Sequence, residues 1–168
     1  MSRKNKEQVT YEPFLESING EPIYSTLGLF DGCTKLEYLP EGFIVPEGIH
    51  TMQNFFRNCS SLKTIPSTFK IPSTAKILAN MFMNCTSLEN LPETFVIPST
   101  VNVVNYMFAN CSNLTGNIYF ENHPDSKISA TNPFMNTVKP IALHLPASQS
   151  QHSMNLQNNP NITVIIYS

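Results

Sequence analysis

The residues with the clearest potential for chemistry in this 168-residue chain are its four cysteines, which recur at a constant interval of 26 in the sequence. A thiol can ligate a metal, form a disulfide or act as a nucleophile. The interval lacks the Cys-x-x-Cys pairs of a zinc site, and one cysteine per repeat gives every thiol the same structural position. We therefore predict a ladder of buried, reduced thiols, with a metal or oxidation site as the alternative. The cysteines are Cys33, Cys59, Cys85 and Cys111.

No other set of side chains forms a recognisable catalytic pattern. Asp31 and Asp125 are the only aspartates, and neither belongs to a nucleophile–base arrangement. The histidines are scattered, and the sequence contains no phosphate loop, dinucleotide fingerprint or Gly-x-Ser-x-Gly motif. The sequence thus predicts a protein that is not an enzyme and that uses no cofactor or metal. The histidines are His50, His123, His144 and His152.

Composition narrows the class of partner. Only 13% of the residues are charged and the net charge is −2, so no Lys/Arg-rich face is available for nucleic acid. No stretch approaches the roughly 20 apolar residues that span a bilayer, and the first thirty residues lack the apolar segment of a secretory signal. We expect a chain that is cytoplasmic when synthesised, with neither a nucleic-acid nor a membrane partner.

The residues before each cysteine predict one helix per repeat. In the repeat that contains Cys111, apolar side chains from Val101 to Cys111 recur at helical intervals, and Pro98 with two following hydroxyl residues marks a helix start. Glycine or asparagine closes each segment, and both tolerate the left-handed conformation at a helix C-terminus. We therefore expect helices near 49–57, 75–83 and 101–109. The closing residues are Gly32, Asn58, Asn84 and Asn110.

The residues after each cysteine predict short strands. Each segment ends at a proline in the first three repeats, and proline cannot donate to a ladder of hydrogen bonds. One strand and one helix per repeat is the leucine-rich-repeat plan, an α/β repeat with a parallel sheet on one face and short helices on the other. The expected strands are 36–39, 62–65, 88–91 and 114–119, followed by Ile141 to Leu145 and Ile162 to Tyr167.

The period also divides the chain into three parts. Repeats of period 26 cover 22–137, and the repeated phenylalanines, such as Phe82, are expected to pack against both neighbouring repeats. Residues 1–21 are predicted to be an N-terminal cap or tail, and 138–168 a C-terminal cap with a terminal strand. That apolar strand should lie at a sheet edge, where either the 147–160 segment or a second chain covers it.

The repeat resembles a known family. The pattern Val-x-x-x-x-x-Met-Phe-x-x-Cys-x-x-Leu, as in Val101 to Leu114, is similar to the BspA-like class of bacterial leucine-rich repeats over about 22–145. The resemblance implies a right-handed solenoid without enzymatic activity, used for adhesion and protein recognition. Such repeats occur in surface proteins of gut and oral bacteria and in phages of those hosts. This chain departs from the pattern because it is short and has no export signal or lipidation cysteine near its start.

Candidate partner-binding residues are the strand positions that change from repeat to repeat, since positions that hold the scaffold repeat. Tyr38 is the strongest of them, because aromatic residues dominate binding hot spots. The alternatives are that these side chains are only solvated, or that Tyr38 packs on the N-terminal cap. The candidates are Glu37, Tyr38, Lys63, Thr64, Glu89 and Asn90.

Two functional hypotheses follow. The first is a non-catalytic leucine-rich-repeat recognition module that binds another protein, or alternatively a glycan, and that forms oligomers if the C-terminal edge strand is the contact. The second is a phage-encoded host-interaction protein, either a tail-associated receptor binder or an inhibitor of a bacterial defence complex. Its location would then be the virion or the host cytoplasm.

Overall fold

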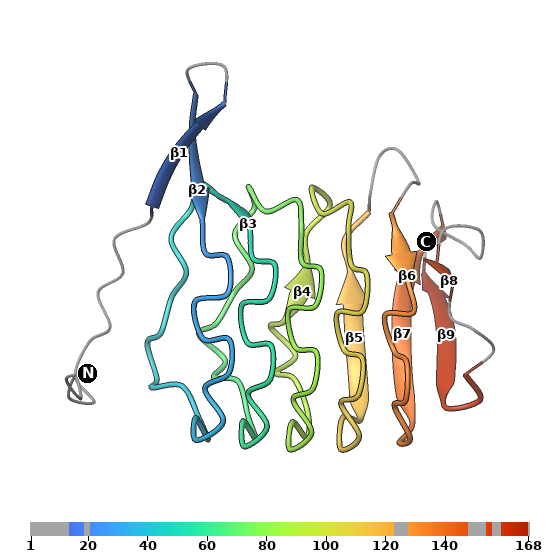
Figure 1. Cartoon of the computed structure of the whole chain (residues 1–168). Helices are drawn as coiled ribbons and strands as arrows, with labels where there is room; N and C mark the ends of the chain where they lie inside the picture. Colours follow the sequence, from blue (N-terminus) through green and yellow to red (C-terminus); the bar gives the residue numbers. More distant parts are fainter. Residues whose placement is uncertain (1–13, 19–20, 123–127, 148–153, 156–158, 168) are drawn as a thin grey trace.

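The computed structural model describes residues 14–18, 21–122, 128–147, 154–155 and 159–167. Its repeats lie side by side as a stack of coils, with β1 near one end and β9 at the other (Figure 1). The described residues form nine strands: β1 (Phe14–Ile18), β2 (Glu21–Ser25), β3 (Ile49–Thr51), β4 (Val96–Ile97), β5 (Gly116–Phe120), β6 (Ala130–Thr131), β7 (Ile141–Pro146), β8 (Met154–Asn155) and β9 (Ile162–Tyr167).

These strands form three sheets. β1 and β2 are antiparallel, and β2 also pairs in parallel with β3. β4, β5, β7 and β9 form a parallel sheet in that order, and β6 pairs in parallel with β8. The predicted parallel sheet is therefore confirmed. The expected strands Ile141 to Leu145 and Ile162 to Tyr167 are confirmed as β7 and β9, and β9 lies at the edge of its sheet.

The earlier predicted strands are shorter than expected. Segments 36–39, 62–65 and 88–91 each contribute one residue to a parallel ladder, from Tyr38 to Thr64 to Asn90. In the second repeat the N–H of Leu62 closes a turn on the carbonyl of Cys59, and Pro66 follows, so only three residues between them are free to extend. The fourth repeat has Ile118 at the position of that proline, and β5 runs through it.

The predicted helices near 49–57, 75–83 and 101–109 are wrong. These ranges consist of turns and isolated ladder residues, apart from β3 in the first. Alternate residues bond to different neighbours: the N–H of Phe56 donates to the carbonyl of Met81 in the next coil (2.8 Å), while that of Arg57 closes a turn on Asn54 (3.1 Å). Half of the N–H groups are therefore unavailable for helical hydrogen bonds.

Left-handed residues every fourth position also exclude a helix. The expectation that Gly32, Asn58, Asn84 and Asn110 adopt this conformation is confirmed, with φ between 62° and 74°. A second left-handed residue lies four positions before each of them, and in the last three cases it falls inside a range expected to be helical. Turns that repeat every four residues bury the same positions as an amphipathic helix, which explains the misleading pattern. The second set is Gly28, Asn54, Asn80 and Tyr106.

Two columns of phenylalanine rings run through the core along the stack. Phe82 stacks on Phe56 with ring centroids 5.3 Å apart and on Phe108 at 5.4 Å, so the prediction that it contacts both neighbouring repeats is confirmed. It also meets the second column edge-on at Phe95, at 5.9 Å. The first column is Phe30, Phe56, Phe82, Phe108 and Phe134, and the second is Phe43, Phe69 and Phe95.

The thiol ladder forms in three of the four repeats. Cys59, Cys85 and Cys111 are fully buried, and all four cysteines are free thiols. The Sγ of Cys85 donates to the carbonyl of Phe56 in the preceding coil at 3.0 Å. The prediction that Cys33 is also buried is wrong, because it belongs to the first of these coils and no described coil precedes it.

This difference predicts selective thiol labelling. In the native, reduced protein, a thiol-specific reagent should modify Cys33 rapidly and the other three cysteines only on unfolding, because their sulfur atoms are inaccessible. Mass spectrometry of peptides after short exposure checks this result. Comparable labelling of Cys85 would contradict the stacking of the coils.

No helix in the described part of the chain is long and apolar enough to cross a membrane. Residues 1–13 lie outside the described residues, and so does most of the 147–160 segment, one of the two covers expected for β9.

Candidate functional site

The six predicted partner-binding residues lie together on one face of the stack. Successive segments pair through main-chain hydrogen bonds, so that the carbonyl of Glu37 accepts from the N–H of Lys63 at 2.9 Å. In the same way the carbonyl of Lys63 accepts from Glu89 at 3.1 Å. The structure thus brings together equivalent segments of three successive repeats, and it exposes all six side chains. They are Glu37, Tyr38, Lys63, Thr64, Glu89 and Asn90.

This array has little net charge of its own. The Nζ of Lys63 lies 3.0 Å from Oε2 of Glu37, and each side chain is 56% exposed. An exposed ion pair contributes little to stability, on the order of 0–1 kcal/mol. The ion pair neutralises Glu37 and Lys63, so that Glu89 carries the remaining charge among the six candidates. The array therefore favours polar and aromatic contacts over a strongly charged ligand.

Tyr38 is the large aromatic side chain of the array. It is 57% exposed, and the cap on which it was alternatively expected to pack falls largely in residues 1–13, outside the described part of the chain. Its parallel pairing with Thr64 holds the backbone beneath it on the ladder. A largely accessible aromatic ring on a paired backbone is suited to a contact with a protein partner.

A second cluster, which the sequence analysis did not single out, lies on the outer face of the four-stranded sheet. Strand register aligns Tyr119 with His144 and His144 with Ile165. The rings of Tyr119 and His144 stack with centroids 4.4 Å apart, and Nε2 of His144 lies 2.9 Å from Oδ1 of Asn117. Tyr167 lies on the same face, two residues beyond Ile165, and its hydroxyl donates to the carbonyl of Phe120. We call Tyr119, His144, Ile165 and Tyr167 the C-terminal patch.

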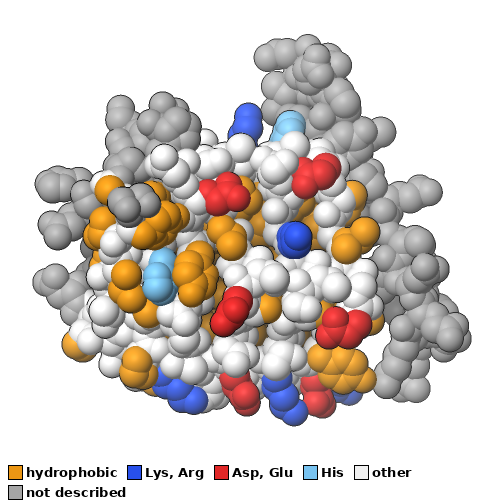
Figure 2. Space-filling model, turned by 180° about the vertical axis from the view of Figure 1, so that it is seen from behind, with side chains coloured by type: hydrophobic (Ala, Val, Ile, Leu, Met, Phe, Trp, Pro, Cys, Tyr) orange, Lys and Arg blue, Asp and Glu red, His pale blue; other side chains and the backbone are white. Residues whose placement is uncertain are grey.

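Figure 2 shows hydrophobic side chains gathered toward the C-terminal end of the molecule, with acidic and basic side chains spread over the remainder. Ile165 is 40% and Tyr167 39% exposed. The alternation of β7 was the signal that could have revealed part of this patch, since it turns Ile141, Leu143 and Leu145 inward and hence His144 outward. Its alignment with Tyr119 was not predictable from the period, because the interval between these residues is 25 and not 26.

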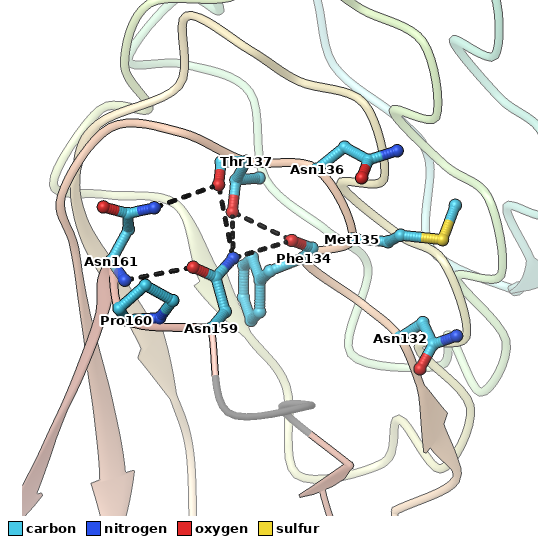
Figure 3. A pocket seen from close by; sticks show the side chains of 8 residues that line it. All are labelled: Asn132, Phe134, Met135, Asn136, Thr137, Asn159, Pro160 and Asn161. Atoms are coloured by element: carbon cyan, nitrogen blue, oxygen red, sulfur yellow. Dashed lines mark hydrogen bonds between the residues drawn. The ribbon is translucent and has the colours of Figure 1, made fainter.

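A polar pocket of about 290 Å³ lies beside the turn at residues 133–136, near the C-terminal end of the stack (Figure 3). The amide of Asn159 donates to the carbonyl of Phe134 at 3.1 Å and to Oγ1 of Thr137 at 2.9 Å. Oδ1 of Asn132 is buried and has no partner among the described residues. Asparagine, threonine and proline side chains provide no acid, base or nucleophile here. The lining residues are Asn132, Phe134, Met135, Asn136, Thr137, Asn159, Pro160 and Asn161.

Asp31 has structural partners on the neighbouring coil. Hydrogen bonds from the Arg57 guanidinium hold the pKa of Asp31 below its ordinary value. Asp31 also accepts from the Asn58 amide at 3.0 Å, which begins a ladder of asparagine amides along the stack. Each later amide donates to the one before it at 2.6–2.8 Å. The ladder continues through Asn84, Asn110 and Asn136.

The buried thiols are protonated. Burial raises the pKa of Cys59 and of Cys111 to about 12, and it raises the pKa of Cys85 further in the same direction. A thiolate is the nucleophilic and metal-binding form of cysteine, so these positions are suited to neither role. Within the described residues, no three histidine, cysteine or acidic side chains are placed to hold a metal ion.

Comparisons of the chain with protein-family models, with curated proteins and with solved structures find no match in any of the three.

Proposed function

We propose that this chain is a right-handed leucine-rich-repeat solenoid of the BspA-like type that acts as a non-catalytic recognition module for another protein. The observation that carries the proposal is the array on the sheet face. Equivalent positions of successive coils present six exposed side chains that differ in chemistry from coil to coil. A repeated scaffold with varied exposed positions is the arrangement by which stacked-repeat proteins recognise partners.

Two further features support binding over catalysis. The parallel ladder through successive coils presents a phenol, a hydroxyl and an amide at Tyr38, Thr64 and Asn90. The C-terminal patch extends the outer surface with an aromatic stack. Side chains of these kinds supply hydrogen bonds and apolar contact area at interfaces.

A site-specific crosslink tests the proposal. A photoreactive phenylalanine analogue in place of Tyr38 should capture a protein from a bacterial lysate, while the same analogue in place of Ile44 should not. Ile44 is the matched control because it is apolar and 71% exposed but lies outside the ladder. The captured protein should then bind the Tyr38→Ala variant at least about 10-fold more weakly than wild type, and bind Ile44→Ala normally.

The outcome also separates the alternatives. Capture of a phage tail component or a subunit of a bacterial defence complex would support the phage-encoded alternative. Binding to a glycan array that is lost on Tyr38→Ala would replace the protein partner by a glycan. Unchanged affinity in Tyr38→Ala would show that the sheet-face array is not the binding surface.

A further inference from the structure

Among the described residues, the edge of β9 that faces away from β7 has no neighbouring strand, and two of its residues direct main-chain groups to that side. The N–H of Ile141 donates to the carbonyl of Asn161 at 2.9 Å, and Ile141 lies opposite Ile162 in the parallel register. Main-chain groups of successive residues in a strand point to opposite sides. The odd-numbered residues of β9 therefore face β7, and the N–H and C=O groups of Val164 and Ile166 face away from the sheet. No hydrogen bond joins these groups to a described residue.

The side chains of the same residues lie at an unfinished core. Val164 is aligned with Leu143 and Ile166 with Leu145, both of which are buried. Val164 and Ile166 hence point toward the core layer, yet they are 38% and 43% exposed because no described coil covers them.

β9 also lacks the features that keep edge strands apart. Natural edges are protected by charged side chains, prolines or bulges. The strand Ile162–Tyr167 contains no charged residue and no proline, and it pairs with β7 in an unbroken register. At the opposite end of the stack β3 pairs with β2 and β2 with β1, so that β1 is the edge strand there.

We propose that β9 pairs in antiparallel orientation with β9 of a second copy of this chain. The register that uses the free groups places Val164 opposite Ile166 of the second copy, and Ile166 opposite its Val164. Each of these pairs exchanges two hydrogen bonds. Ile165 then faces Ile165 of the second copy on the two-fold axis. This contact is independent of the proposed partner binding.

A second copy fits this edge on both faces. On the core side, Val164 and Ile166 of the two copies meet and continue the apolar layer. On the outer face, Ile165 meets its own equivalent and joins the two C-terminal patches into one band, because Ile165 is next to His144 and His144 is next to Tyr119. No like charges oppose each other within the strand. Antiparallel pairing of β9 with β9 is also self-limiting, since it uses the same edge of both copies and closes at two.

Sedimentation of the full chain over a roughly 100-fold range of micromolar concentration tests the proposal, since a contact of one strand is smaller than a standard interface and should dissociate on dilution. The mass should rise from that of one 18.9 kDa chain to twice that value. Ile165→Lys and Ile165→Glu should each stay monomeric, because each places like charges on the two-fold axis. An equimolar mixture of these two variants should dimerise again. Ile44→Lys, at an exposed residue outside the sheet, should dimerise like wild type.

Each of the other results overturns the inference. Wild type that stays monomeric over the whole range would show that the edge is covered or inert. Dimers that persist in both charged variants would place the contact elsewhere. Masses above two copies would contradict the closed pairing. Melting curves and circular dichroism of the two variants, matched to wild type, establish that a monomeric result does not come from unfolding.

Discussion

Raising the pH from about 8.5 toward 12 should destabilise the protein steeply, by about 1.4 kcal/mol per pH unit for each buried thiol. In the unfolded chain a cysteine ionises near pH 8.5. In the folded chain burial raises the pKa of Cys59 and Cys111 to about 12 and also raises that of Cys85. Between these values the unfolded state binds fewer protons, so the free energy of unfolding falls as the pH rises. Below about pH 8.5 the thiols should contribute no slope.

Denaturant unfolding at a series of pH values, under reducing conditions, measures this slope. Cys85→Ser should make the fall in unfolding free energy less steep by about 1.4 kcal/mol per pH unit, because a serine hydroxyl does not titrate in this range. Cys33→Ser is the matched control, since Cys33 is exposed. Equal slopes in wild type and Cys85→Ser would contradict a thiol origin for alkaline destabilisation.

Phe82→Ala should destabilise the protein by about 3–5 kcal/mol. The ring is fully buried and stacks on both neighbouring coils, at 5.3 and 5.4 Å between centroids, so its removal leaves a cavity that neighbouring rings fill poorly. A loss of this size is a large part of the stability of an ordinary domain. Thermal and denaturant unfolding of the purified variant measures it.

Phe30→Ala is the matched control for this change. Phe30 occupies the same column at its N-terminal end, where its ring is only partly buried and stacks on one neighbour within the column, Phe56. Its loss should therefore be clearly smaller than that of Phe82. Equal losses at the two positions, or unchanged melting of Phe82→Ala, would show that the column does not stabilise the stack cooperatively.

Several features were predictable from the sequence because they depend only on the constant interval of the repeat. A residue that recurs in every coil stacks on its own equivalents, which made the phenylalanine column and the alignment of Tyr38, Thr64 and Asn90 readable from spacing. The left-handed conformation of Asn58, Asn84 and Asn110 was also readable, since asparagine tolerates this backbone region better than most residues. Strand β7 followed from the alternation of apolar and polar residues between Ile141 and Leu145, and β9 from an apolar run of strand length.

The turns in place of helices were decided by tertiary hydrogen bonds. The apolar spacing from Met52 to Cys59 fits both a helix and a series of four-residue turns. The turns form because alternate N–H groups find carbonyl partners in the next coil, as that of Phe56 does at Met81. Such a partner is distant in the sequence, so the local pattern of apolar residues does not predict it.

The two ends of the stack were also decided by tertiary structure. Cys33 is exposed because burial of this position comes from a preceding coil, which no residue in its own repeat can supply. His144 meets Tyr119 because β7 pairs with β5 in a register that departs from the repeat interval, and Ile165 joins them because the register of β9 on β7 departs from it further. Where the interval changes, spacing no longer tells which side chains are neighbours, and only the paired strands bring this patch together.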